Sequence, residues 1–355
     1  MRLRNRVLGD PAVSRWATAF PLTRPIARAR ARRIFDLVAG FAYAQATAAA
    51  VESGLLAFLA GGGATASAFA AEAGLPLRSA ETLLRAAAAL DLAEEVAPGR
   101  YALGRLGESL SASPGIAELV AHHRLLYADL ADPLALLRRG GGGGRLASLW
   151  SYASGGAGPG TTAAAAYSRL MAASQPLIAA HILDAVDLRR ARHLLDIGGG
   201  EGAFLEAAIA RHPHLSCTLF DLPEVARRAQ VRLGARAAVV AGDFRTDPLP
   251  RGADIVSLVR VAHDHEDEVV AALFERIGAG LAPGGRLLVA EPMAGTRGAK
   301  PAGHAYFGLY LLAMGQGRVR TADELRALLR AAGFRKVREA PTHLPIAVRV
   351  LVATR

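Results

Sequence analysis

Cysteine and lysine are nearly absent from this sequence of 355 residues. Its single cysteine, Cys217, excludes a framework of intramolecular disulfides and agrees with a reducing compartment. Lys300 and Lys336 are the only lysines, so the formal net charge of +11 comes almost entirely from arginine. Uninterrupted apolar runs of the roughly 20 residues that span a bilayer are also missing. We therefore expect a soluble or membrane-peripheral protein, in the cytoplasm or at the inner membrane.

The arginines are concentrated at the N-terminus. Residues 1–35 hold nine arginines and one acid, together with Trp16 and Phe20. This arm lacks the serine content of a transit peptide and the apolar core of a secretion signal. A basic arm with aromatic residues suits an anionic membrane surface, a nucleic acid or a partner subunit.

The first part of the chain has the pattern of helices followed by a winged helix. Apolar spacing predicts a helix over residues 36–59, and residues 65–110 follow with helix, turn, helix and hairpin. The second of these helices offers only Arg78 and Arg85 against Glu81, which is too little to read a DNA groove. We therefore expect a scaffold or dimer interface and no nucleic-acid partner.

Two glycine-rich tracts, at residues 138–145 and 154–162, mark loops near the predicted domain boundary. We expect a helical and winged-helix domain over residues 1–159 and a second domain over residues 160–355. In the second domain, short apolar strands alternate with helices, which predicts a parallel sheet covered on both faces. The last two strand-like runs leave no room for a helix between them, so an antiparallel hairpin should close the sheet.

The turn "LLDIGGGEGAF" after the first of these strands is the candidate cofactor site. Glycines let the backbone approach a ligand closely and adopt positive φ. The same letters fit a dinucleotide-binding turn, but a carboxylate before the glycines suits a cationic ligand and repels a diphosphate. The candidate cofactor-binding residues follow the first three strands: Asp196, Gly198, Gly200, Asp221, Leu222, Asp243 and Phe244.

Six stretches of the sequence carry a resemblance to a known family. "GDF", "RVAHDHEDE", "LAPGGRLLVAEPM" and "GQGRVRTADELRALLRAAGF" resemble the dimeric small-molecule O-methyltransferases that include the caffeic acid and acetylserotonin enzymes. "RWATAFPLTRPIARARARRIFDLVAGFAYAQ" and "EPMAGTRGAKPAGHAYFGLYLLAMGQGRVRT" resemble more narrowly the demethylspheroidene (hydroxyneurosporene) O-methyltransferases of bacterial carotenoid biosynthesis. The resemblance implies a class I methyltransferase fold, S-adenosyl-L-methionine as cofactor, a homodimer, and methyl transfer to the tertiary hydroxyl of an acyclic carotenoid.

The cluster "RVAHDHEDEVV" follows the fourth strand, at the edge where ligands of open α/β sheets bind. By resemblance, His263 matches the family's catalytic histidine, although in the carotenoid enzymes the position of His265 is the one that usually holds a histidine. Either could be the general base, and Asp264 is a further candidate to test. Glu291 matches the first of two glutamates that orient the family's histidine, whereas the second position holds Val319.

Other interpretations stay open at this point. Residues 263–267 begin like a dinuclear zinc site, but Glu268 stands where that class needs a histidine, so we expect no metal. Functional alternatives are methylation of a phenolic or polyketide compound, a nicotinamide-dependent oxidoreductase, and a winged-helix DNA-binding regulator. Several side chains are candidates to line an apolar substrate tunnel: Tyr167, Met171, Met293, Tyr306, Phe307, Tyr310 and Met314.

Overall fold

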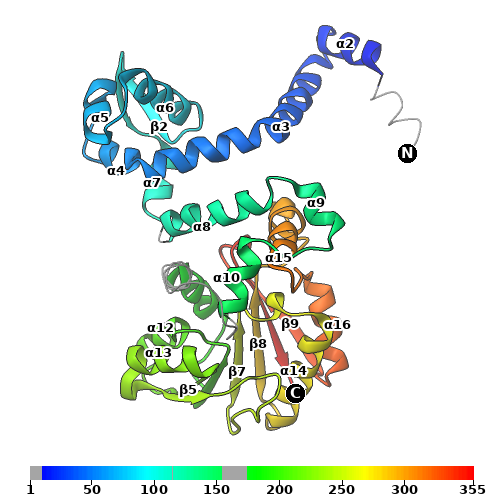
Figure 1. The fold of residues 1–355 in the computed structure, drawn as a ribbon. Coiled ribbons are helices and arrows are strands. Elements are labelled where there is room, and N and C mark those ends of the chain that lie inside the picture. The colour runs from blue at the N-terminus through cyan, green and yellow to red at the C-terminus, as the bar shows by residue number, and fades with distance from the viewer. Residues whose placement is uncertain (1–9, 114, 154–173) are drawn as a thin grey trace. The chain divides into compact units, whose positions relative to one another are not determined.

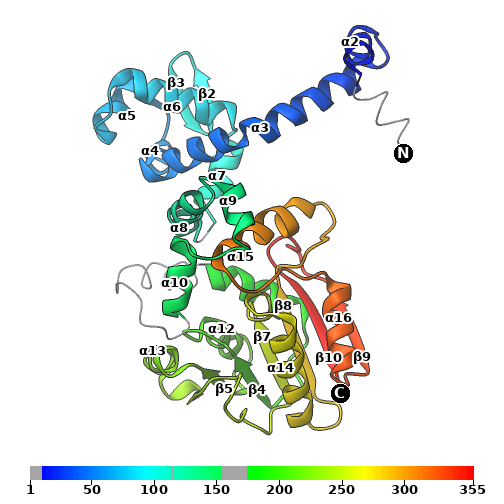
Figure 2. The same cartoon turned by 45° about the vertical axis from the view of Figure 1, so that its right-hand side comes forward.

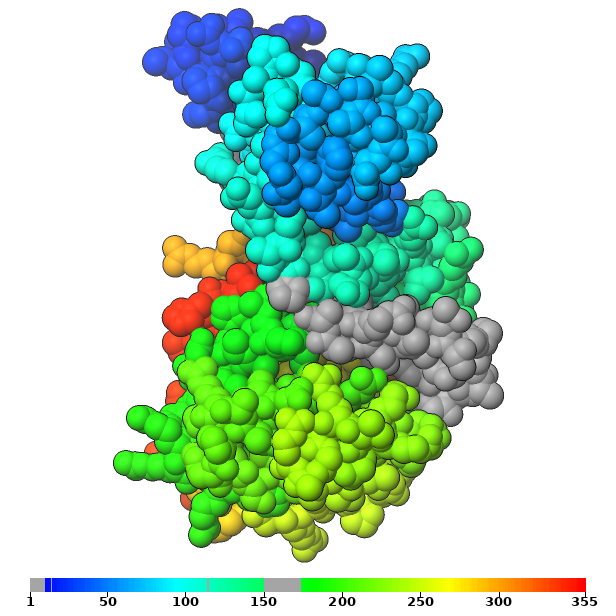
Figure 3. All heavy atoms as spheres, turned by 90° about the vertical axis from the view of Figure 1, so that its left-hand side faces the viewer, coloured from blue at the N-terminus to red at the C-terminus, as the bar shows by residue number. Residues whose placement is uncertain are grey.

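The computed structural model describes residues 10–113, 115–153 and 174–355, and the rest of the chain is grey in Figures 1 and 3. The side chains of Ser14 and of residues 150–153 are also outside the description. The chain forms two compact units, residues 1–113 and 114–355.

The first unit begins with helices whose bounds differ from the predicted single helix. They are α2 (Pro11–Ala19), α3 (Arg24–Glu52) and α4 (Leu55–Ala60). Gly54, at φ +74°, separates α3 from α4 and accounts for the break, because a left-handed residue ends a helix. Helix α3 begins at Arg24, before the predicted start at residue 36, and ends before the predicted end at residue 59.

Helix α3 is apolar but exposed in the single chain. Ala50 is its one buried residue among those described, while Phe35 and Phe41 are 63% and 73% exposed. An 18-residue window of α3 has a mean hydropathy of 1.4, and only 6% of that window is buried. By length and composition alone the helix could cross a membrane, which the interrupted apolar runs of the sequence did not predict.

The rest of the first unit is the predicted winged helix. A three-stranded sheet has the order β1-β3-β2, with all pairs antiparallel. Its apolar core is centred on Phe69, Leu84 and Tyr101. The elements in chain order are β1 (Ala64–Thr65), α5 (Ala66–Ala73), α6 (Leu77–Ala89), β2 (Ala93–Ala97), β3 (Arg100–Leu103) and α7 (Arg105–Ser111).

The second unit opens with three helices that the sequence placed in the first domain: α8 (Ile116–Asp129), α9 (Pro133–Arg138) and α10 (Arg145–Ala153). Leu126, Leu136 and Leu146 of these helices pack in one apolar cluster with Leu311 and Met314. This packing explains why the compact units divide at residue 113 and not near the glycine tracts. The second tract, residues 154–162, lies outside the described residues.

A seven-stranded sheet in the order β6-β5-β4-β7-β8-β10-β9 is the framework of the second unit. The strands β4 to β8 pair in parallel, and β10 runs antiparallel to both β8 and β9, as the sequence predicts. The strands are β4 (His193–Ile197), β5 (Ser216–Asp221), β6 (Ala238–Ala241), β7 (Ile255–Val259), β8 (Arg286–Glu291), β9 (Lys336–Ala340) and β10 (Arg349–Thr354).

Helices cover both faces of this sheet. Leu288 and Ala290 of β8 pack with α12, α13 and the helix over residues 174–185, while Leu287 and Val289 pack with α14 and α16. Figure 2 shows α14 and α16 together on one side of the strands. The helices are α12 (Ala203–Arg211), α13 (Pro223–Leu233), α14 (Asp267–Gly280), the π-helix η3 (Ala302–Phe307), α15 (Gly308–Met314) and α16 (Ala322–Ala331), with the 3-10 turns η1 (Gly234–Arg236) and η2 (Ala262–Asp264).

Candidate active site

The glycine turn between β4 and α12 has a conformation that side chains disfavour. Gly198, Gly200 and Gly202 lie at φ +67°, +59° and +84°, in the left-handed region. A Cβ atom on Gly200 would meet no atom within 4 Å, so this glycine faces open space. A Cβ atom on Gly199 would lie 2.5 Å from Oδ2 of Asp196. The turn is therefore open on one side and closely packed on the other.

Asp196 is fully buried behind this turn. Its Oδ1 accepts a hydrogen bond from Ser257 Oγ at 2.6 Å, and its Oδ2 has no hydrogen-bond partner among the described residues. Burial raises the pKa of the carboxyl to about 7. The sequence predicted Asp196 as a ligand-binding residue, whereas the structure places its carboxyl against Gly199 with no exposed surface.

Asp221 ends β5 beside the same turn. Its Oδ2 accepts from the Gly200 N–H at 2.8 Å and its Oδ1 from the Leu222 N–H at 2.7 Å. Burial raises its pKa to about 6, against the lowering effect of these two hydrogen bonds. Each carboxylate oxygen can accept a second hydrogen bond. Asp221 thus ties the glycine turn to the start of α13 and keeps acceptor capacity for a hydroxyl.

Asp243 and Phe244 follow β6 and complete the predicted cofactor-binding residues. The carboxylate of Asp243 pairs with Arg245 at 2.6 Å, and this hydrogen bond lowers the pKa of Asp243. The ring of Phe244 meets the ring of His265 edge-on, with centroids 5.1 Å apart. The third strand end is therefore joined to the histidine cluster through an aromatic contact.

His263 lies in η2, just after β7, and is 9% exposed. Its Nδ1 lies 2.5 Å from Oε2 of Glu291, and its Nε2 lies 3.2 Å from Oδ1 of Asp264. The other oxygen of Glu291 accepts from the backbone N–H groups of Val261 and Ala262, at 3.0 and 2.7 Å. Glu291 thus holds the imidazole and the backbone before it at the same time.

Charge around His263 favours its protonated form. Burial alone lowers the pKa of the imidazole, but Asp264 and Glu291 outweigh burial and raise this pKa above its ordinary value. Burial in turn raises the pKa of Asp264 to about 6. A histidine between two carboxyls is suited to accept a proton, because both neighbours stabilise the imidazolium.

His265 points elsewhere. Burial, with the charges of Arg245 and His263, lowers the pKa of its imidazole to about 4. No hydrogen bond to its ring nitrogens occurs among the described side chains and backbone, and its ring contact is with Phe244 on the predicted cofactor side. The two histidines of the cluster therefore have different surroundings, with acidic partners at His263 and an aromatic one at His265.

The aromatic candidates for a substrate tunnel gather near His263. Phe307 meets the His263 ring at a centroid distance of 6.4 Å, and Tyr306 lies edge-on to Phe307 at 4.9 Å. The hydroxyl groups of Tyr306 and Tyr310 contact Nε2 of two histidines of α8, His123 at 2.8 Å and His122 at 2.7 Å. Met293 and Met314 are buried in two different apolar clusters, while Tyr167 and Met171 lie outside the described residues.

Two arginines next to Val319 make contacts that the sequence does not predict. Val319 is buried in an apolar cluster, so the family's second acid has no counterpart there. Arg320 is 2% exposed and hydrogen-bonds the loop that holds His263, and Arg318 pairs with Asp267 at the start of α14. The pattern "GRVRT" places two arginines beside Val319 but does not show that they reach the loop after β7.

The residues at the strand ends fit S-adenosyl-L-methionine. The open side of the glycine turn admits a ligand against the backbone, and the acceptor groups of Asp221 and Asp243 suit hydroxyl and amino donors. A carboxylate-rich edge also suits a positively charged sulfonium better than a diphosphate. Groups of three or more metal-ligating side chains are not found in the described part of the chain.

Comparison with known proteins agrees with this geometry. The sequence model of a protein family described as an O-methyltransferase domain matches residues 127–335 of this chain. Demethylspheroidene O-methyltransferase of Cereibacter sphaeroides is 42% identical over 100% of this chain and 95% of its own length. The Rhodobacter capsulatus protein of the same description is 41% identical over 94% of this chain and 85% of its own.

Solved structures agree as well. Human N-acetylserotonin methyltransferase in complex with SAM has a TM-score of 0.78 and 26% identity, covering 92% of this chain and 97% of the human one. The likeness confirms the predicted fold class, a methyltransferase sheet preceded by a helical region. The chain belongs to the O-methyltransferase family and is an S-adenosyl-L-methionine-dependent enzyme, not the oxidoreductase or the DNA-binding regulator that its sequence left open.

Proposed function

We propose that this enzyme methylates the tertiary hydroxyl of a hydroxylated acyclic carotenoid, of the demethylspheroidene or hydroxyneurosporene type. The observation that carries the proposal is the 42% identity across the whole chain to a protein described as a demethylspheroidene O-methyltransferase. Identity over the full length includes the helices that precede the sheet, and so extends beyond the cofactor-binding half.

The surroundings of His263 support an apolar acceptor. Phe307, Tyr306 and Val319 are apolar or aromatic groups at or near the histidine, and Val319 stands where the broader family has an acid. Replacing an acid by valine removes a charge that a polyene would otherwise have to desolvate. An acceptor with a single hydroxyl at the end of an apolar chain fits such a site.

In the mechanism we propose, His263 takes the hydroxyl proton. When bound, S-adenosyl-L-methionine would supply the electrophilic methyl group, whose bond to the sulfonium sulfur breaks as the C–O bond forms and leaves a neutral thioether. A neutral imidazole that donates its Nδ1–H to Glu291 carries its lone pair on Nε2, which lies 3.2 Å from Oδ1 of Asp264 and takes the proton of the acceptor hydroxyl. An aliphatic tertiary alcohol is far less acidic than imidazolium, so proton removal accompanies formation of the new C–O bond and does not precede it. Glu291 and Asp264 then stabilise the imidazolium that results.

A direct assay tests this function. Purified enzyme would be incubated with S-adenosyl-L-methionine and, separately, with hydroxyneurosporene, demethylspheroidene or 3-amino-4-hydroxybenzoate. The phenolic compound is included because a 3-amino-4-hydroxybenzoate 4-O-methyltransferase of Streptomyces cremeus is 31% identical over 91% of this chain. We expect one added methyl group on the carotenoids. Methylation of the phenol without methylation of either carotenoid would refute the proposal.

We further propose that the enzyme is a homodimer and that α3 supplies much of the interface. Large apolar side chains of α3 are at least half exposed in the single chain: Ile26, Ile34, Phe35, Leu37, Val38 and Phe41. Contiguous apolar surface of this kind is costly in water and marks an interaction site. Light scattering should give the mass of a dimer for the purified protein and of a monomer for a Phe35→Glu, Phe41→Glu variant.

We also propose a cytoplasmic enzyme that touches the inner or photosynthetic membrane through its basic N-terminal region. The support is the run of exposed arginines at the start of α3, including Arg28, Arg30, Arg32 and Arg33, because basic segments bind anionic lipid surfaces. Sedimentation with anionic liposomes should weaken when these four arginines are replaced by glutamine. Unchanged sedimentation would count against the contact.

A further inference from the structure

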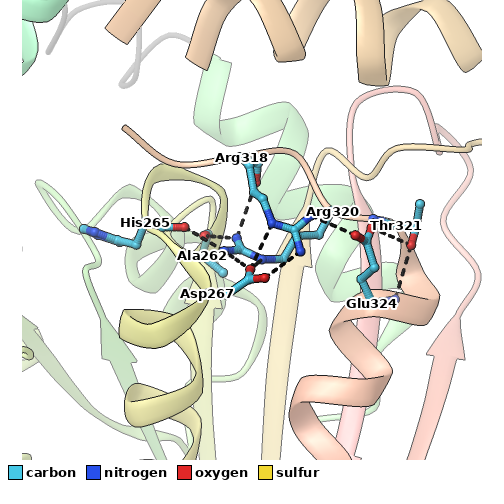
Figure 4. A network of polar contacts seen from close by, with 7 residues as sticks. All are labelled: Ala262, His265, Asp267, Arg318, Arg320, Thr321 and Glu324. Carbon is cyan, nitrogen blue, oxygen red and sulfur yellow. Dashed lines mark hydrogen bonds and ion pairs between the residues drawn. The ribbon is translucent and has the colours of Figure 1, made fainter. Parts of the chain in front are cut away.

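Arg320 is a buried cation that bonds the backbone of the His263 loop. Its Nη1 donates to the carbonyl oxygen of Ala262 at 2.7 Å, and its Nη2 to that of His265 at 2.8 Å. Its Nε donates to Oδ1 of Asp267 at 2.7 Å. Figure 4 shows the guanidinium among these three acceptors, with the His265 ring pointing away from it.

The two carbonyl groups bracket the proposed base. Ala262 and His265 stand immediately before and after the pair His263–Asp264, so one rigid guanidinium fixes both ends of this short segment. Glu291 holds the same segment through the backbone N–H groups of Val261 and Ala262. The N–H groups of the loop therefore donate to a carboxylate, and its carbonyl groups accept from a guanidinium.

Charge neutralisation of Arg320 is incomplete within its own contacts. Asp267, its one carboxylate partner among the described residues, also pairs with Arg318 at 2.7 Å, and Arg318 has a second partner in Glu324 at 2.8 Å. The side chain of Arg320 is 1% exposed, against 38% for Arg318. A buried guanidinium that shares its only acid depends on carbonyl oxygens for the rest of its stabilisation.

The segment that carries Arg320 is itself fixed against the loop. The Gly317 N–H donates to Oε1 of Glu266 at 2.9 Å, and a Cβ atom on Gly317 would lie 2.3 Å from the carbonyl oxygen of His263. The Ala294 N–H donates to the carbonyl oxygen of Arg320 at 2.9 Å, just beyond β8. Arg320 is thus held at both ends, because its backbone bonds Ala294 and its guanidinium bonds the loop.

We propose that Arg320 is a positioning residue for methyl transfer, which acts by fixing the backbone on both sides of His263 so that its imidazole stays on Glu291. This inference rests on the proposed function, in which His263 is the base. At the neighbouring position, Val319 gives no polar contact to the histidine. The support that the segment 317–320 gives to the base in this enzyme therefore passes through main-chain carbonyl groups.

The test compares three variants, Arg320→Gln, Arg320→Lys and Arg326→Gln. Arg326 is the matched control, because it pairs with Asp323 and Glu339 and makes no ion pair with the loop among the described residues. A misplacement of about 1 Å at a reacting group costs about 100-fold in rate. We expect kcat to fall about 100-fold in Arg320→Gln and about 10-fold in Arg320→Lys, with unchanged affinity for S-adenosyl-L-methionine by calorimetry, and to stay within about twofold in Arg326→Gln.

A second readout needs neither cofactor nor acceptor. NMR titration of the His263 ring nitrogens in the protein without ligand should show the raised imidazole pKa in the parent enzyme and Arg326→Gln, and a lower pKa in Arg320→Lys. Arg320→Lys keeps the charge beside Asp267, so it serves even where Arg320→Gln does not fold. Unchanged kcat and unchanged His263 titration in Arg320→Lys would overturn the inference. A parent enzyme that binds the cofactor but methylates no carotenoid would instead overturn the proposed function.

Discussion

The glycine turn after β4 and the histidine loop after β7 end neighbouring strands of one sheet, yet they are held in different ways. The shape of the turn is set by its own three left-handed glycines and by the carboxylate of Asp221, which ends the adjacent strand β5. In the loop, Arg260 is left-handed at φ +58°, a conformation that costs energy for a residue with a side chain. The loop keeps its shape through Glu291 and Arg320, which are about 30 and 60 residues further along the chain.

The difference has a functional consequence. A cofactor-binding turn needs access to its backbone, and glycine supplies this locally. A proton acceptor needs a fixed orientation and a tuned pKa, which require charged side chains from several elements. Substitutions in the turn should therefore change cofactor affinity, whereas substitutions around the loop should change kcat.

The largest expected effect separates the two histidines of the loop. We expect His263→Gln to lower kcat about 1,000-fold, because general-base catalysis contributes about 10²–10⁴. The matched variant His265→Gln should lower kcat less than about 10-fold, because His265 contacts Phe244 and has no acidic hydrogen-bond partner among the described residues. Steady-state kinetics with a carotenoid acceptor measure both values. An equal loss in His265→Gln would show that the loop works differently.

A smaller loss is expected from Glu291→Gln. The glutamine oxygen can still accept from the backbone N–H groups, but the negative charge beside Nδ1 of His263 is lost. We expect kcat to fall about 100-fold while calorimetry gives an unchanged affinity for S-adenosyl-L-methionine. If affinity fell as much as kcat, the division of labour between loop and turn would be wrong.

The turn is tested by Gly199→Ala. Its new Cβ atom would lie 2.5 Å from Oδ2 of Asp196 and 3.0 Å from Leu219, so the turn must move. We expect about 10-fold weaker binding of S-adenosyl-L-methionine by calorimetry, with kcat at saturating cofactor within about threefold. Gly234→Ala, at a glycine with φ +57° just after α13 whose new Cβ atom would meet no atom within 4 Å, is the control for backbone strain without a steric contact.

The pH dependence should show the smallest change. A base must be neutral to act, so kcat/KM should fall as pH drops through the pKa of His263, which Asp264 and Glu291 hold above 6.5. Asp264→Asn should move this acidic limb to lower pH. In folding, the raised pKa means that the contribution of His263 to stability is complete below pH 6.5 and is lost as pH rises through the folded value. A limb that stays in place in Asp264→Asn would contradict this assignment.

The same contrast between local and distant contacts separates the features that the sequence predicts from those that it does not. The strand ends, the glycine turn and the terminal hairpin could be predicted, because each is encoded by a short local pattern. Arg320 could not be found this way, since its role depends on a contact with Ala262 across 58 positions. Asp196 lies in β4 just before the turn, and a sequence does not say that its carboxyl is buried behind Gly199. The division into units at residue 113 likewise depends on packing that joins α8 with α15.

The central claim is that His263 removes a proton from a carotenoid hydroxyl as that oxygen is methylated. Its most direct test uses S-adenosyl-L-methionine with an isotope-labelled methyl group, hydroxyneurosporene, and mass spectrometry of the extracted carotenoid. The account predicts one labelled methyl group on the carotenoid with the parent enzyme and about a thousandth of that initial rate with His263→Gln. Equal rates for both enzymes, or no labelled carotenoid from a parent enzyme that binds the cofactor, would contradict it.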